Sequence, residues 1–446
     1  MKTSRAFAIS GVIALTLLGG IACGARDSPP NILLVVLDTV RADAVGRTFN
    51  RRQVTPHFDR IAAEGSRYLH AYATAPWTLP SHATLFTGLA SSQHLAVHES
   101  FVLGSQHLTL AEMLAGRGYA TYGISSNPWV TEGRGLAQGF DEFVTAYSDA
   151  QDAPDKGAAR ATEYAIEFIA RHAQGDEPFF LFVNYLEAHL PYAPPEAGFE
   201  ALGIATGSLS RREFTIEQAE EIIAGERDAS EDELELARTL YQCEIAYQDR
   251  QLGELIDTLR ERDLLDETLV VITADHGELF GIEGLMGHEF SLSDDVLQVP
   301  LVLRHPSRIR AGHTVELPVS HLDIVPTVLD FVGASEAAAT LEGSSLLAAE
   351  NLSPERPLIA EYFEPRTLIG RYWASRHPEF DTEPFAVSLR SLRKGSRKLV
   401  ENSRGEITLS DENLRATDDN RPAREDLARE MREELTHWIA RLRPTK

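Results

Sequence analysis

The stretch Asn31-Ile-Leu-Leu-Val-Val-Leu37 is a continuous apolar run, and Asp38 follows it directly. A short apolar run without alternating polar residues is typical of a strand that is buried on both faces of a parallel sheet. Similar runs occur at residues 179–183, 269–273 and 300–303. The sequence therefore predicts several buried strands, of which this stretch forms the first.

Helical patterns separate these runs, most clearly at residues 163–172 and 231–263. Strands that alternate with helices predict an α/β fold, in which a mostly parallel central sheet carries helices on both faces. Ligand sites in such sheets lie at the carboxyl ends of the strands. Asp38 and the pair Asp275-His276 each follow a predicted strand. We therefore expect a functional site where these strands end.

The chain divides into two predicted units. Residues 31–350 form the main domain, which includes a charged surface insertion at residues 206–232 that leads into a long helix. Residues 351–446 form a small C-terminal α+β subdomain. Its last segment carries apolar residues at helical spacing, which predicts a helix packed onto a sheet. These residues are Leu427, Met431, Leu435, Trp438, Ile439 and Leu442.

The composition limits the class of protein and the kind of partner. The 446 residues are 43% hydrophobic and 24% charged, which fits a soluble globular protein and excludes fibrous and disordered classes. Acidic residues outnumber Lys and Arg by 67 to 42, giving a net charge of −25. Such a charge repels phosphodiester backbones, so we expect no nucleic-acid partner. A small anionic substrate would need a local positive centre, such as a bound metal.

The first residues have the pattern of an export signal. Lys2 and Arg5 precede an apolar run at residues 7–21, which is too short to span a bilayer comfortably. Residues 1–22 are therefore predicted to be a signal peptide, and residues 23–30 a polar tether.

Cys23 directly follows the predicted signal peptide. We expect it to be lipidated and to attach the protein peripherally to a membrane, as an exported lipoprotein of the bacterial envelope, in the periplasm or at the cell surface. Simple secretion is the alternative, because Gly20 stands where an aliphatic residue is usual. The only other cysteine is Cys243, so a structural disulfide is not expected.

The stretch Asp275-His276-Gly277-Glu278 places a carboxylate and an imidazole directly after a buried strand. Together these groups can share one divalent ion. The structural alternative is a turn with a capping Asp and an exposed His. Asp38 can likewise be either a functional residue or an ordinary turn residue after a strand. Neither Asp38 nor residues 275–278 alone establish a metal site.

Residues 75–88 supply a third element. Pro80 suits the first turn of a helix and Gly88 can end it, so Thr78 is expected just before the helix amino end. Free N–H groups there attract an oxyanion and help to lower the pKa of the hydroxyl once a metal binds it. The structural alternative is that Thr78 is only a helix cap.

Residues 78–88 read Thr-Leu-Pro-Ser-His-Ala-Thr-Leu-Phe-Thr-Gly, which resembles the sulfatase signature Cys/Ser-x-Pro-Ser-Arg with its downstream Thr-Gly. Residues 37–43 and 273–278 resemble the two strand ends that carry metal ligands in that family. The likeness covers about residues 31 to 335, and implies an alkaline-phosphatase-like sheet with residues 31–350 as the catalytic domain. Further agreement lies at residues 184–191, 241–249 and 322–327.

Departures from the sulfatase pattern bear on the reaction. Sulfatases oxidise the signature Cys or Ser to formylglycine, whereas Thr78 would attack as its own alkoxide. His82 stands where sulfatases have Arg, and residues 124–127, which end in Asn127, replace the expected Gly-Lys-Trp-His. Two sulfate-binding cations are thus missing, and we expect His82 and Asn127 to bind substrate or support the site.

A further departure resembles the threonine-nucleophile branch of the superfamily, which includes phosphodiesterases and phosphoethanolamine transferases. His288 stands where sulfatases have Lys, and His189, with Glu187 beside it, resembles another histidine of that branch. The resemblance implies catalytic roles for Thr78, His189 and His288. It also implies metal ligands at Asp38, Thr78, Asp275 and His276, with His189, His288 and Glu187 as further candidates.

We therefore expect a metal-dependent hydrolase or transferase that acts on phosphate mono- or diesters through Thr78. The substrate would be a small anionic ester, with a lipid or glycan as one possible attachment. One or two divalent ions are expected, with Zn favoured over Mn or Ca. The alternatives are a sulfuric ester hydrolase that does not use formylglycine and an inactive glycan-binding surface lipoprotein. The histidines at positions 94, 98 and 321 are either supporting residues or ordinary polar packing.

Overall fold

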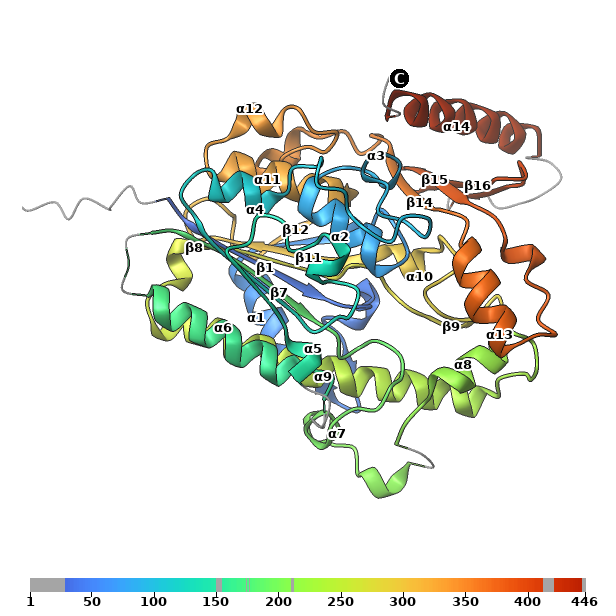
Figure 1. Cartoon of the computed structure of the whole chain (residues 1–446), viewed down its shortest axis with the longest axis horizontal. Helices are drawn as coiled ribbons and strands as arrows, with labels where there is room; N and C mark the ends of the chain where they lie inside the picture. The colour runs from blue at the N-terminus through green and yellow to red at the C-terminus, as the bar shows by residue number, and fades with distance from the viewer. Residues whose placement is uncertain are drawn as a thin grey trace, which may run out of the picture.

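The computed structural model describes residues 29–149, 155–173, 175, 177–209, 212–411 and 421–442. Its centre is a twisted sheet with helices on both faces (Figure 1). Within the described residues this sheet has nine strands, in the order β12-β4-β11-β8-β1-β7-β5-β6, with β13 beside β4. The strands are β1 (Asn31–Leu37), β4 (Ser66–Tyr72), β5 (Ala120–Ser125), β6 (Glu142–Thr145), β7 (Phe179–Tyr185), β8 (Thr268–Thr273), β11 (Gln298–Arg304), β12 (His313–Val315) and β13 (Val319–Ser320).

The middle of the sheet is parallel. Strands β8, β1, β7, β5 and β6 all run in one direction, and Val36 of β1 pairs with Asn184 on one side and Thr273 on the other. Every residue of β1 is buried, because a parallel strand covered by helices on both faces has no solvent side. The predicted fold class is confirmed.

Strand β11 differs from its parallel neighbours, because it runs antiparallel to both β8 and β4. Between β8 and β11 the chain forms a hairpin of β9 (Leu279–Ile282) and β10 (Leu285–Gly287), followed by the short helix α10 (Asp294–Leu297). A parallel return needs a long crossover connection, and no crossover helix lies here. The apolar run at residues 300–303 therefore identified a buried strand but not its direction.

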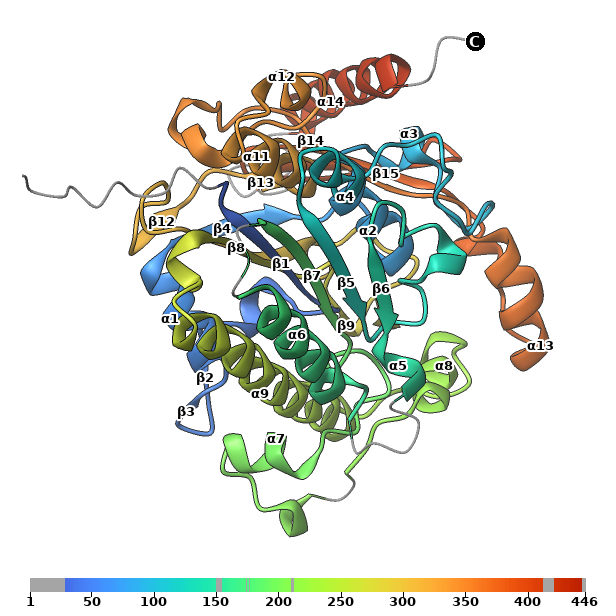
Figure 2. The same ribbon diagram turned by 60° about the vertical axis from the view of Figure 1, so that its left-hand side comes forward.

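Two groups of helices cover the sheet (Figures 1 and 2). The first covers one face and consists of α1 (Pro56–Glu64), α6 (Ala158–His172) and α9 (Glu231–Glu261). The second covers the other face and consists of α2 (Thr78–Thr87), α4 (Leu110–Ala115) and α11 (Ile324–Phe331). Helix α9 agrees with the predicted long helix and begins at a capping box formed by Ser230 and Glu233. The predicted insertion before it contains a helix of its own, α8 (Ile216–Ile223).

A second, smaller sheet lies at one end of the molecule. Its strands are antiparallel and are named β14 (Leu358–Tyr362), β15 (Leu389–Lys394), β16 (Arg397–Asn402) and β17 (Ile407–Asp411). Helix α14 (Arg421–Leu442) packs on this sheet through the predicted apolar stripe, of which Leu427 is only partly buried. The expected C-terminal α+β subdomain is therefore present, while its boundary near residue 350 stays a prediction.

The predicted signal peptide and Cys23 lie outside the described residues. Among the residues that the structure does describe, no helix combines the length and the apolar character that a membrane span requires.

Candidate active site

Four neighbouring strands place polar side chains at one edge of the sheet. Asp38 follows β1, Asp275 follows β8, Asn184 lies near the end of β7, and Asn127 follows β5. These strands are adjacent in the order β8-β1-β7-β5 and are parallel. Their carboxyl ends therefore meet, as expected for a ligand site in an α/β sheet.

Asp38, Asp275 and His276 form a compact group of metal-ligand type. One ligand atom from each lies within 4.8 Å of the others, and all three side chains are fully buried. Asp38 Oδ1, Asp275 Oδ2 and His276 Nε2 have no hydrogen-bond partner outside the group, and the last two lie 3.3 Å from each other. Unpaired buried polar atoms are costly, and one divalent cation would satisfy all three. The residues present therefore fit a bound metal ion.

The backbone around these ligands is held in an unusual shape. Thr39 has a φ of 57°, which costs a non-glycine residue about 1 kcal/mol or more. Its N–H donates to Asp275 Oδ1 over 3.1 Å, and its carbonyl accepts from the Tyr241 hydroxyl over 2.8 Å. A Cβ at Gly277 would lie 2.1 Å from the carbonyl oxygen of Asp295. Only glycine fits at that position.

The charges of the group depend on one another. Burial and the nearby Asp275 raise the pKa of Asp38 to about 8. Burial alone would lower the pKa of His276, but the Asp275 carboxylate raises it to about 9. Burial would raise the pKa of Asp275, yet His276 holds it below its usual value. Two carboxylates thus favour a positive charge between them, and a metal ion could supply that charge in place of a proton.

Thr78 lies beside this group at the first residue of α2. Its Oγ1 lies 3.4 Å from Nδ2 of Asn127, and the same nitrogen donates to Asp38 Oδ2 over 2.7 Å. Trp77, not Thr78, occupies the N-cap position of the helix. The Thr78 hydroxyl is therefore not needed as a cap and is directed to the carboxylate group through Asn127.

Three histidines come together next to the ligand group. The ring centre of His288 lies 4.3 Å from that of His276 and 5.2 Å from that of His189. His288 Nδ1 donates to Glu278 Oε1 over 3.0 Å, and Nδ1 of His189 and of His276 donates to a backbone carbonyl oxygen, over 2.6 and 3.0 Å. When Nδ1 donates, Nε2 keeps its lone pair as a metal ligand or base. Burial lowers the pKa of His189 to about 4 and that of His288 well below its usual value, which favours the neutral form of both rings.

His82 and Glu187 occupy supporting positions. His82 is fully buried, and its Nδ1 donates to the carbonyl oxygen of Thr78 over 2.9 Å and lies 3.6 Å from Asp275 Oδ2. Its ring packs edge-on against Phe86 and Phe182, so its contacts are with the protein.

The Glu187 carboxylate is engaged at the start of helix α6. It accepts the backbone N–H of Lys156 over 3.0 Å and that of Ala158 over 3.1 Å. This carboxylate is not a member of the three-ligand group, although the sequence made it a candidate for a further ligand position.

Several residues of the site were not expected from the sequence. Asn184 donates to Asp38 Oδ2 over 3.2 Å, and its place at the end of an apolar run was an available signal. Ser81 Oγ donates to the Asp275 carbonyl over 2.7 Å and lies 3.3 Å from Nδ1 of His321. Glu278, which holds His288, was part of a recognised pattern without an assigned role.

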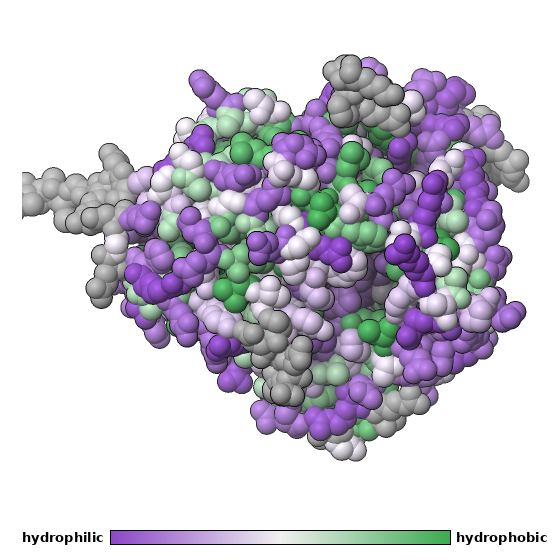
Figure 3. Space-filling model, in the orientation of Figure 1, coloured by the Kyte–Doolittle hydropathy of each residue, from purple (hydrophilic) through white to green (hydrophobic). Residues whose placement is uncertain are grey.

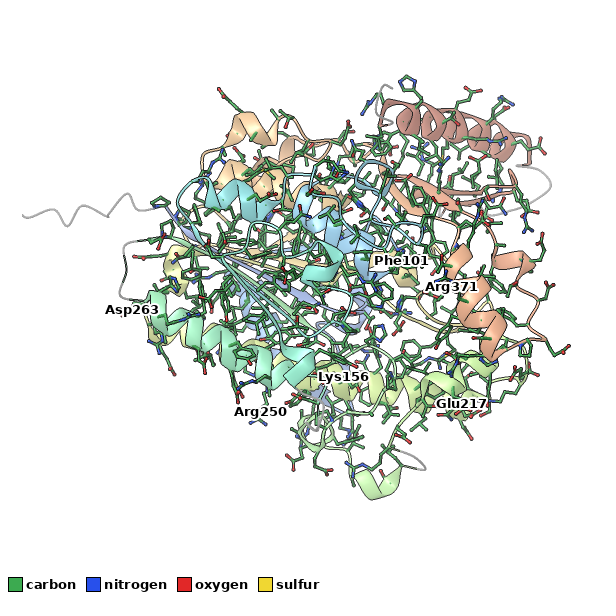
Figure 4. The ribbon with its side chains drawn as sticks, viewed as in Figure 1. Phe101, Lys156, Glu217, Arg250, Asp263 and Arg371 are labelled. Carbon is green, nitrogen blue, oxygen red and sulfur yellow. The ribbon has the colours of Figure 1, made fainter. Side chains whose placement is uncertain are left out.

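Aromatic side chains cluster beside Asn127 and Trp77. The Trp129 backbone N–H donates to Oδ1 of Asn127 over 2.7 Å. The centre of the Trp129 ring lies 5.8 Å from the centre of the Trp77 ring and 5.6 Å from that of the Phe101 ring. Figure 4 labels Phe101 on the viewer's side, and the same face in Figure 3 is mainly hydrophilic with a recess near its centre.

The fold and the motifs have a match among known families. A model of the sulfatase family matches residues 30–334. The chain belongs to the sulfatase family. Members of this family generally bind a divalent metal, in agreement with the ligand group described above. It is thus a sulfatase-family hydrolase of the alkaline-phosphatase-like superfamily.

Individual sulfatase-family relatives are distant. The uncharacterized sulfatase YidJ of Escherichia coli strain K12 is 25% identical over 366 residues, which cover 72% of this chain and 70% of that one. A choline-sulfatase of Rhizobium meliloti strain 1021 is 24% identical over 438 residues, covering 83% and 84%. The phosphonate monoester hydrolase of Agrobacterium radiobacter has a similar structure, with a TM-score of 0.70, 22% identity, and coverage of 92% and 96%. That last likeness shows the fold alone.

Proposed function

We propose that this sulfatase-family protein is a metal-dependent hydrolase that cleaves phosphate mono- or diesters with Thr78 as the nucleophile. The observation that carries the proposal is the Asn127 amide, which contacts both the Thr78 hydroxyl and Oδ2 of Asp38, whose other oxygen has no hydrogen-bond partner. A free threonine hydroxyl is a weak nucleophile and requires activation. The Thr78 hydroxyl lies beside the ligand group of Asp38, Asp275 and His276, which could bind a cation. It also lies at a helix amino end, where N–H groups attract an oxyanion.

The metal would be held by Asp38, Asp275, His276 and the Thr78 oxygen. When bound, a divalent ion stabilises an alkoxide and withdraws charge from the oxygens of the ester. Two carboxylates with one imidazole suit Zn or Mn better than Ca, and we favour Zn.

The chain's own groups account for the remaining chemistry. The Thr78 hydroxyl gives up its proton as its oxygen forms a bond to phosphorus; the bond to the leaving oxygen breaks, and the departing alkoxide takes up one proton to become the alcohol. Water then attacks the phosphorylated Thr78 and restores its hydroxyl, which releases phosphate from a monoester substrate or a phosphate monoester from a diester; transfer to an acceptor alcohol is the variant reaction. His189 and His288, with Nε2 available, would accept the proton of the attacking water or hold a second ion that neutralises substrate oxygens.

The proposal also concerns where the protein works. Residues 1–22 would direct export, and lipidated Cys23 would hold the enzyme at the bacterial envelope. An ester carried by a lipid or a glycan is available at that surface. The net charge of −25 would disfavour anions away from the metal site, so a small anionic group must be recognised locally.

A sulfuric ester hydrolase that works without formylglycine is the second candidate. Its support is the family itself and relatives named as sulfatases. Threonine at position 78 argues against it, since the family's modified residue derives from Cys or Ser. An inactive glycan-binding protein would have no need for the three unpaired ligand atoms of Asp38, Asp275 and His276.

A substrate panel tests the proposal. The full chain, reconstituted with Zn, Mn or Ca, would be assayed against matched aryl phosphate monoesters, phosphodiesters, phosphonate monoesters and sulfate esters. We expect a phosphate ester to give the highest kcat/KM, and activity to disappear on metal removal. Preferred turnover of sulfate esters by the unmodified protein would return the assignment to the sulfuric ester hydrolases.

A further inference from the structure

Lys156 is not part of the ligand group, but it contacts the loop that carries His189. Its ammonium Nζ donates to the backbone carbonyl of Glu187 over 2.5 Å and to that of His189 over 2.8 Å. A third contact joins it to the carboxylate of Glu244 on helix α9. Figure 4 shows Lys156 beside that helix. An ammonium group has three donors and no acceptor, which matches the three oxygens around it.

The contact between the two segments is reciprocal. While Lys156 Nζ donates to the loop, the Glu187 carboxylate of the loop accepts the backbone N–H of Lys156 and of Ala158. Glu244 also binds the far end of the loop, since its Oε1 accepts the Ala193 N–H over 2.6 Å. Residues 187–193 are thus tied to the start of α6 and to α9 through main-chain groups.

This arrangement decides where the His189 ring points. The partner of His189 Nδ1 is a main-chain group and not a side chain. Nδ1 donates to the carbonyl oxygen of Leu190 in the same loop. Its direction toward His288, 5.2 Å away between ring centres, therefore depends on the loop backbone. That backbone is held at the His189 carbonyl by Lys156.

We propose that Lys156 is a positioning residue, which holds the loop of His189 so that the imidazole faces His288. The inference rests on the proposed function of His189, and Lys156 itself is not assigned a contact with substrate. Methionine cannot replace it, because its side chain offers no donor to the three oxygens. Arginine offers a planar fork instead of a compact ammonium, so it would restore the contacts only in part.

The test compares Lys156→Met with Lys394→Met in the full chain. Lys394 is a matched control, because its side chain is 21% exposed against 17% for Lys156 and it pairs with Glu434 in the C-terminal subdomain. We expect Lys156→Met to lower kcat about 10- to 100-fold, the usual effect of losing a partner that orients a ligand or base. KM should change little, Lys156→Arg should recover part of kcat, and Lys394→Met should keep wild-type kcat.

A double variant separates positioning from charge balance. Lys156→Met leaves the buried Glu244 carboxylate without its ammonium partner, which is destabilising. Adding Glu244→Gln should restore the melting temperature but not kcat. A return of kcat to the wild-type value in the double variant, or an unchanged kcat in folded Lys156→Met, would overturn the inference.

Failure of the positioning role of Lys156 can be distinguished from failure of the proposed phosphate-ester activity. The assays use whichever ester the wild-type protein hydrolyses, so exclusive sulfate turnover would refute the phosphate proposal and leave the comparison of Lys156 variants valid. Crystal structures give a readout without activity. The rings of His189 and His288 should separate in Lys156→Met and keep their spacing in Lys394→Met; unchanged spacing in both variants would refute the positioning role.

Discussion

Nδ2 of Asn127 lies 3.4 Å from Oγ1 of Thr78, although the two residues are 49 positions apart in the chain. The amide comes from the end of β5 and the hydroxyl from the start of α2. Since the same nitrogen also binds the Asp38 carboxylate, it fixes the hydroxyl relative to the ligand group. A threonine that served only the helix would not require this contact.

Replacement of Thr78 is the direct test of the nucleophile. Thr78→Ala should lower kcat by about three orders of magnitude or more, while Thr78→Ser should keep a measurable part, because a hydroxyl remains to be activated. Activity and melting temperature would be measured on the same preparations. A mere capping role predicts a different pattern, in which Thr78→Ala costs about 1 kcal/mol of stability and leaves catalysis nearly unchanged.

The covalent step gives a second readout of the same residue. A slow phosphodiester should leave its added mass on Thr78, detectable by peptide mass spectrometry. Label on another residue would contradict the mechanism. Thr78→Cys, coexpressed with the formylglycine-generating enzyme, should not gain sulfatase activity, because His82 replaces the Arg that completes the recognised sulfatase pattern.

The ligand group predicts that metal content and activity are lost together. Asp275→Asn and His276→Ala each remove a group with an unpaired ligand atom, so both variants should lack stoichiometric metal in elemental analysis. Asp249→Asn is the matched control. Asp249 is also a buried carboxylate, but it accepts the N–H groups of His57 and Phe58 at the start of α1. Full metal content in the two site variants would contradict the assignment.

The sequence was sufficient for those parts of the site that depend on local patterns. The apolar run of β1 predicts a buried strand, and parallel neighbours place Asp38 and Asp275 at one edge without further information. The helix at residues 78–87 was expected from Pro80 and the glycine that ends it, and Gly88 has a φ of 69°; Thr78 was expected just before the helix and is its first residue. In these cases the residues that determine the strand or helix are adjacent in the sequence to the site residues.

Long-range contacts were not predictable in the same way. Strand β4 contains Arg67 and His70 and has no continuous apolar run, so its place in the sheet depends on pairing with β11 and β12. Lys156 reaches Glu244 across 88 positions, and no local pattern connects the two. Glu187 was expected to be a possible metal ligand because of its neighbour His189, yet its carboxylate binds the start of α6. Packing of the helices decides these contacts.

The predicted lipid anchor can be tested by fractionation. Cys23→Ser should move the protein from the membrane fraction to the soluble exported fraction, because the substitution removes the thiol that would carry the lipid. Catalytic constants of the released protein should match the wild type. Wild-type protein found in the soluble exported fraction would leave simple secretion as the correct interpretation.

An ion-pair cluster near the C-terminal subdomain predicts a pH dependence of stability. His377 lies 2.8 Å from Glu226 and 3.2 Å from Glu220. Burial opposes a charge on this imidazole, but the two carboxylates raise its pKa above the ordinary value, which is about 6.5. A raised pKa stabilises the folded state fully below the ordinary pKa, and this contribution is lost as the pH rises through the folded value. His377→Gln should therefore lower the melting temperature more at about pH 6 than at about pH 9. In a double-mutant cycle with Glu226→Gln, coupling should be larger at the lower pH than at the higher one; equal coupling at both would refute the charged pair.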